Sequence, residues 1–195
     1  MKLLFLDVET LGLDPELYDL IEIGALLDVD GQVVDTLDAR VKPLRTVYED
    51  EAVRVNGYTP TSWTPNMDGK QAADRLFAMS STATLVGHNI WFDHSFVARF
   101  VRLHLFVNPF SYRMVDTSSL AWPLVLSGSI QNTSLANICR HLQLQNEPMP
   151  HRAINGARLA REVYYKLLAG HAGCRFVDDY PSREQAIDLD RKELR

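Results

Sequence analysis

Apolar residues form an almost unbroken run near the start of the chain, at Leu3-Leu4-Phe5-Leu6. A strand that is covered on both faces is apolar at nearly every position, so this run predicts a buried strand over residues 2–8. Two more strands are predicted over residues 20–29 and 32–41. Asp30-Gly31 between them favours a tight hairpin turn, because both residues tolerate a positive φ.

Apolar residues at helical spacing are the main pattern after residue 65. They predict helices over residues 69–79, 92–105 and 153–168. Phe77 is expected on the apolar side of the first of these, and Gly170 is expected to end the last. A further helix is predicted to begin after an N-cap at Thr133 or Ser134.

Short strands are predicted over residues 82–86 and 113–115, whereas residues 43–65 contain many turn-forming residues and are expected to be irregular. Helices therefore alternate with strands after an initial hairpin. This order predicts an α/β domain in which a mixed sheet is flanked by helices. We expect this domain to cover residues 1–170 and to be followed by a polar appendage over residues 171–195.

Composition places the chain among soluble globular proteins, since 46% of its residues are hydrophobic and 23% are charged. No apolar run is long enough to span a bilayer, and no signal peptide is recognisable, so no membrane partner is expected. The two cysteines suggest no disulfide framework; Cys139 is expected to pack inside a helix, and the expected location is cytoplasmic. A net charge of −5 argues against bulk electrostatic coating of nucleic acid but is compatible with a nuclease.

The first predicted strand ends with two carboxylates that are two positions apart, Asp7 and Glu9. Residues two apart on a strand point in the same direction, so both side chains are expected on one face. Buried anions are costly unless a cation neutralises them, and Mg²⁺ or Mn²⁺ prefer oxygen ligands. For an isolated pair of this kind, a strand end that meets solvent is the better interpretation.

Two later segments belong with this pair. Gly87-His88-Asn89-Ile90-Trp91-Phe92-Asp93 follows a predicted strand and opens a helix, and His151-Arg152-Ala153 opens the last helix. Taken singly, Asp93 can be an N-cap and His151 a surface or capping residue.

In their order and spacing, the three segments resemble the DEDDh family of 3′–5′ exonucleases, which includes ribonuclease T, oligoribonuclease and the polymerase III proofreading subunit. The resemblance implies a ribonuclease-H-like fold and two divalent ions, Mg²⁺ or Mn²⁺. It implies that Asp7, Glu9 and Asp93 bind these ions and that His151 accepts a proton from the attacking water. The partner it implies is a 3′ end of DNA or RNA, and the product a nucleoside 5′-monophosphate.

The chain departs from the third motif of this family, His-x-Ala-x-x-Asp-Ala, at one position. Gly156 stands where the fourth carboxylate is expected. Three consequences are open: weakened activity, a protein that binds nucleic acid ends or a protein partner without cutting, or a recent change from an active parent. A phosphatase or nucleotide hydrolase that uses Asp7 as its nucleophile is a weaker alternative, because it explains neither the second motif nor His151.

Substrate contacts are expected from residues beside the motifs, namely Thr10, Leu11, Asn89 and Trp91. Trp91 is a candidate for stacking on a terminal base, and Leu11 for a wedge against it. Several arginines lie near the motifs in the sequence, although each alone is expected on a solvated helix face: Arg99, Arg102, Arg152, Arg158 and Arg161.

Overall fold

The structure is a computed structural model that describes residues 1–105, 110 and 113–171. Its strands form one sheet in the order β3-β2-β1-β4-β5, with the bounds β1 (Lys2–Thr10), β2 (Leu20–Val29), β3 (Gln32–Arg40), β4 (Thr84–Gly87) and β5 (Met114–Asp116). β2 is antiparallel to both β1 and β3, whereas β1, β4 and β5 run parallel. The predicted mixed sheet is confirmed.

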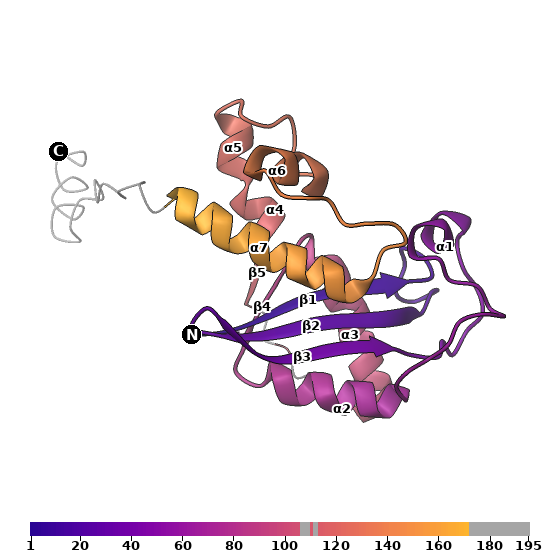
Figure 1. Cartoon of the computed structure of the whole chain (residues 1–195). Helices are drawn as coiled ribbons and strands as arrows, with labels where there is room; N and C mark the ends of the chain where they lie inside the picture. The colour runs from indigo at the N-terminus through magenta and orange to yellow at the C-terminus, as the bar shows by residue number, and fades with distance from the viewer. Residues whose placement is uncertain (106–109, 111–112, 172–195) are drawn as a thin grey trace, which may run out of the picture.

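Helices cover both faces of this sheet: α1 (Asp50–Asn56), α2 (Gly69–Ser80), α3 (Ile90–Leu105), α4 (Thr117–Leu120), α5 (Trp122–Leu126), α6 (Leu135–Leu142) and α7 (Ala153–His171). α7 crosses one face, and α2 and α3 lie against the other (Figure 1). The short helices α4, α5 and α6 gather beside α7. α1 lies beyond the carboxyl end of β1, close to the start of α7.

The predicted elements are confirmed with small shifts in their ends, and Ser134 is the N-cap of α6. Three predictions are wrong. The segment over residues 43–65 contains α1, which ends at the left-handed Gly57. Gly170 does not end α7, because the helical penalty of one glycine, about 1 kcal/mol, is small against the packing of a long helix. Phe77 is exposed on α2 rather than packed on its apolar side.

Side chains of β1 alternate between two hydrophobic clusters. Leu4 and Leu6 pack into the cluster on the α2 and α3 side, whereas Leu3 and Phe5 pack into the cluster on the α7 side. The same alternation carries the odd-numbered positions at the end of β1 toward α7.

α7 comes unusually close to the sheet at its first turn. A β carbon at Gly24 of β2 would lie 2.1 Å from the carbonyl carbon and oxygen of Ala153. Glycine is therefore required where the helix backbone rests directly on the strand backbone. This contact fixes the start of α7 over the middle of the sheet.

The remaining predictions concern membrane-spanning helices, Cys139 and the residues after position 170. Among the described helices, none combines the length and apolar character that crossing a bilayer requires. Cys139 is buried in α6, as predicted. The predicted appendage over residues 171–195, including Cys174, falls outside the described residues except for the final helical position of α7.

Candidate active site

Three acidic side chains meet at the carboxyl end of β1. Glu9 is 8% exposed, Asp7 is partly exposed, and both continue the face of β1 that looks toward α7. Asp93 is buried in the first turn of α3, and its Oδ1 accepts a hydrogen bond from the Val8 amide at 3.0 Å. Among the described residues, none donates a hydrogen bond to the carboxylate of Asp7 or Glu9. These two carboxylates therefore lie at the same site without a hydrogen-bond donor from the described part of the chain, and no unpaired oxygen of theirs is completely buried.

Burial and mutual repulsion make these acids hard to ionise in the protein alone. Burial raises the pKa of Asp7 well above its ordinary value, and the nearby charges of Asp93 and Glu9 raise it further. Burial, followed by repulsion from Glu147 and Glu22, raises the pKa of Glu9 to about 8. Burial likewise raises the pKa of Asp93 to about 8, against the stabilising bond from Val8. A cation placed among them would offset all three effects.

The loop before α3 holds Asp93 in place. Asn89 adopts a left-handed conformation with φ of 55°, and its amide donates to Asp116 Oδ1 at 2.9 Å. Asp116 ends β5 and also caps α4 by accepting from the Ser118 amide. Asp93 is thus not the helix cap that an isolated aspartate suggests, because its carboxylate is turned toward β1.

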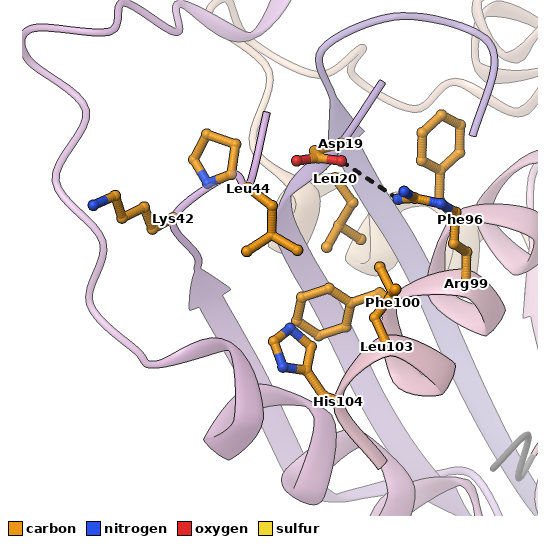
Figure 2. A pocket seen from close by; sticks show the side chains of 10 residues that line it. Asp19, Leu20, Lys42, Leu44, Phe96, Arg99, Phe100, Leu103 and His104 are labelled. Carbon is orange, nitrogen blue, oxygen red and sulfur yellow. Dashed lines mark hydrogen bonds and ion pairs between the residues drawn. The ribbon is translucent and has the colours of Figure 1, made fainter. Parts of the chain in front are cut away.

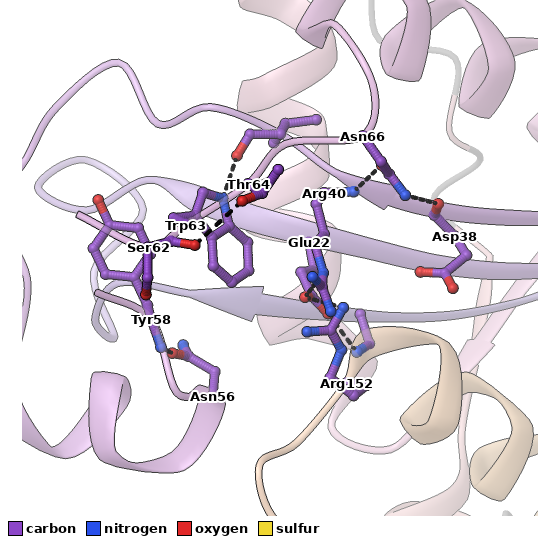
Figure 3. Close-up of polar contacts among 12 residues, drawn as sticks. Glu22, Asp38, Arg40, Asn56, Tyr58, Ser62, Trp63, Thr64, Asn66 and Arg152 are labelled. Atoms are coloured by element: carbon purple, nitrogen blue, oxygen red, sulfur yellow. Dashed lines mark hydrogen bonds and ion pairs between the residues drawn. The ribbon is translucent and has the colours of Figure 1, made fainter. Parts of the chain in front are cut away.

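Glu22 of β2 anchors the first turn of α7. Arg152 and Arg40 converge on its buried carboxylate in Figure 3, at 2.7 Å and 3.1 Å from Oε1. Its Oε2 accepts a hydrogen bond from the Ala153 amide at 3.2 Å. The helix start is therefore tied to the sheet by both charge and backbone contacts, which holds the neighbouring His151 in register with β1.

His151 faces the acidic cluster from the loop before α7. Its amide donates to the Val55 carbonyl at 3.0 Å, and its side chain remains 37% exposed. Nδ1 lies 3.8 Å from Oε2 of Glu147, a residue that the sequence patterns did not single out. Ligand atoms of Glu9, Glu147 and His151 all lie within 4.8 Å of one another.

Gly156 lies on α7 directly against Asp7. A β carbon at this position would be 2.4 Å from Asp7 Oδ2 and 2.5 Å from its Cγ. The acidic side chain that the family motif expects here would thus point into the same cluster. In this chain, the Asp7 carboxylate occupies that space instead.

Comparison with known proteins identifies the family. A family model described as Exonuclease, and named for ribonuclease T, matches residues 4–164. The chain belongs to the DEDDh family of 3′–5′ exonucleases. It is 34% identical over 154 residues to ribonuclease T of Yersinia enterocolitica, which covers 69% of this chain and 68% of that protein. It is 27% identical over 163 residues to the PolC-type DNA polymerase III of Thermotoga petrophila, which covers 84% of this chain.

Solved structures confirm the predicted ribonuclease-H-like fold of this exonuclease domain. Exonuclease I of E. coli in complex with an oligonucleotide superimposes with a TM-score of 0.71 at 16% identity, over 87% of this chain and 40% of that one. Another structure of exonuclease I with single-stranded DNA contains zinc and has a TM-score of 0.72. The chain spans only 12% of the PolC-type relative, so it matches a part of that larger protein.

The residues predicted to contact a substrate differ in accessibility. Trp91 is 62% exposed at the start of α3, whereas Leu11 is fully buried against Ile21 and Tyr58. The prediction for Leu11 is therefore wrong, because its side chain packs into a small hydrophobic cluster just after the end of β1. Thr10 is largely buried, and its hydroxyl donates to the Gly12 carbonyl at 2.8 Å.

Three of the five arginines near the motifs are held by buried acids rather than lying on solvated faces. Arg99 turns toward Asp19 at 3.4 Å in the pocket shown in Figure 2. Arg161 pairs with Asp28 at 2.8 Å, and Arg152 pairs with Glu22 as described above. Arg161 thereby joins α7 to β2, Arg152 joins the residue before α7 to β2, and Arg99 joins α3 to the residue before β2.

Proposed function

We propose that this chain, through its domain at residues 1–170, is a metal-dependent exonuclease that removes nucleoside 5′-monophosphates from the 3′ ends of DNA or RNA. The observation that carries the proposal is the cluster formed by the partly exposed Asp7 and the buried Glu9 and Asp93, beside the accessible His151. Family membership supports the same reaction class.

The donor set fits a hard divalent cation such as Mg²⁺ or Mn²⁺. All three acids offer oxygen ligands, and burial raises the pKa of each, an effect that a bound cation would oppose. Asp7, Glu9 and Asp93 would hold the metal. When bound, such ions stabilise the negative charge that develops on the attacking and leaving oxygens during displacement at phosphorus.

The protein's own residues supply the proton transfer and the substrate contacts. His151 accepts a proton from the attacking water, a role for which imidazole is suited near neutral pH. Its backbone is held by the Val55 carbonyl, and the next residue, Arg152, is paired with Glu22. Trp91 offers an exposed face on which the terminal base stacks, and Thr10 and Asn89 border the same end of β1.

A second candidate function is binding of nucleic acid ends without cleavage. The observation that favours it is the packing of Gly156 against Asp7, since this position contributes no fourth carboxylate. The presence of Asp7, Glu9, Asp93 and His151 in one cluster favours catalysis.

Short single-stranded DNA and RNA oligonucleotides, labelled at the 5′ end, separate these functions. We expect a ladder that shortens from the 3′ end in Mn²⁺ or Mg²⁺, with nucleoside 5′-monophosphates as products. Asp7→Asn and Asp93→Asn should abolish it while retaining the fold. A 3′-phosphorylated oligonucleotide and a circular single strand serve as controls. Cleavage of the circle would indicate an endonuclease, and binding without any ladder would favour the second candidate.

A further inference from the structure

The acidic cluster lacks a side chain from α7. Gly156 faces Asp7, and a β carbon there would already be 2.4 Å from Asp7 Oδ2. The Asp7 carboxylate fills the space that a side chain at position 156 would use, so an acid there would require Asp7 to turn aside. Because glycine offers no side-chain ligand atom, a further protein ligand for a divalent ion in this chain would come from another segment.

Glu147 reaches the cluster from the loop that precedes α7. Its side chain is only 9% exposed, although it belongs to a loop. Oε1 accepts a hydrogen bond from the Arg152 amide at 2.7 Å, which fixes the carboxylate to the first turn of the helix. One carboxylate oxygen of Glu147 lies within 4.8 Å of ligand atoms of Glu9 and His151. Oε2 is 3.8 Å from His151 Nδ1 and accepts no hydrogen bond from the described residues.

We propose that Glu147 supplies the metal-binding carboxylate that Gly156 cannot, so that Glu147 and Glu9 hold the same divalent ion. This inference rests on the proposed function, because it assigns a ligand to the metal site of that exonuclease. It adds a residue that the family motif does not include, at a position outside the helix that usually provides the acid.

Two observations point to a ligand rather than to a surface acid. Glu9 is more than nine-tenths buried, has no hydrogen-bond partner among the described residues, and is directed at Glu147. Two carboxylates enclosed at this separation repel each other unless a cation lies between them. Glu147 is also held in advance by the Arg152 amide, so binding an ion there costs little reorganisation.

A simpler role for Glu147 would be to orient His151. The distance from Oε2 to Nδ1 is 3.8 Å, which is too long for a hydrogen bond. A ligand role predicts weaker metal binding when Glu147 is neutralised, whereas an orienting role predicts unchanged metal binding and an altered pH profile of turnover.

The test is calorimetric titration of Mn²⁺ into the full chain, with Glu147→Gln as the main variant. The amide oxygen of glutamine still accepts from Arg152, so the fold is preserved while the anionic ligand is removed. Asp74→Asn is the matched control, because it removes one exposed carboxylate on α2, where Asp74 pairs with Lys70. Glu147→Asp is the second variant; it keeps the charge but shortens the reach.

We expect Glu147→Gln to weaken Mn²⁺ binding by at least about tenfold, with Asp74→Asn unchanged and Glu147→Asp in between. Glu147→Gln should melt no lower than wild type in EDTA. Equal Mn²⁺ affinity of wild type and Glu147→Gln would overturn the inference, and if Glu147→Gln does not fold, equal affinity of Glu147→Asp would do so.

Asp7→Asn separates this result from the proposed function. If wild type binds Mn²⁺ and Asp7→Asn does not, the proposed metal site is supported independently of the result for Glu147→Gln. If Mn²⁺ binding is absent from wild type or indifferent to Asp7, the metal site itself is wrong, and the role of Glu147 falls with it.

Discussion

The acidic cluster should make the metal-free protein lose stability as the pH rises. Burial, followed by the charges of Glu147 and Glu22, raises the pKa of Glu9 from 4.5 to about 8. A carboxyl that binds its proton more tightly in the folded state favours folding while protonated, and this advantage is lost between the unfolded and folded pKa values. At about 1.36 kcal/mol per pKa unit, the loss between about pH 4.5 and pH 8 is about 5 kcal/mol. Asp7 and Asp93 contribute with the same sign.

A divalent ion should reverse this loss, because it binds the ionised carboxylates of the folded protein. Metal present at about 100 times its dissociation constant adds about 2.7 kcal/mol to the free energy of unfolding. The measurement is urea unfolding followed by circular dichroism at about pH 5 and about pH 8, in EDTA and in Mg²⁺.

Asp7→Asn is the control for the source of the effect. Removing one anion should raise the stability of the metal-free protein at about pH 8 and reduce the gain from Mg²⁺. Equal stability of metal-free wild type at both pH values would refute the reasoning, since it would mean that these carboxylates ionise without penalty.

Three further predictions test the site and its supports. His151→Ala should lower turnover by about 10²–10⁴-fold with little change in oligonucleotide binding. Unchanged turnover in steady-state assays would mean that His151 is only a surface or capping residue. Gly156→Asp should bind Mn²⁺ about tenfold more tightly than Gly156→Ala, which adds the same β carbon without a carboxylate; equal affinities in calorimetry would show that position 156 cannot supply a ligand. Arg152→Met should lower the free energy of unfolding in urea by about 2 kcal/mol, because Glu22 loses its nearest cation. Arg75→Met, which removes an exposed ion pair with Asp35, should lower it by less than about 1 kcal/mol. Similar losses in both variants would argue against the role of Arg152 in anchoring the start of α7.

Sequence patterns predicted the parts of the molecule that depend on local periodicity. The apolar run at the start of the chain and the spacing of two were sufficient to place Asp7 and Glu9 on one face of a buried strand. The same kind of signal was misleading for residues 43–65, where turn-forming residues hide the short helix α1.

Long-range pairing could not be predicted from one sequence. Arg161 and Asp28 are separated by 133 positions, yet they form a partly buried ion pair, and nothing local to either residue indicates the other. Glu147 was missed for a related reason, because it lies in a proline-containing loop without periodicity. Its proximity to His151, four positions later, is the one local signal that could have drawn attention to it.

The close contact between Gly24 and Ala153 bears on how this active site can change over time. Because the two backbones touch, the separation between the strand that carries Asp7 and the segment that carries His151 is set by main-chain geometry and hardly by side-chain conformation. Side chains at the site, such as the one at position 156, can therefore be exchanged one at a time while the backbone arrangement around them is kept. A single methyl group at position 24, by contrast, would wedge the two halves of the site apart. The same backbone contact therefore lets the site tolerate exchanged side chains and makes it sensitive to one added methyl group at position 24.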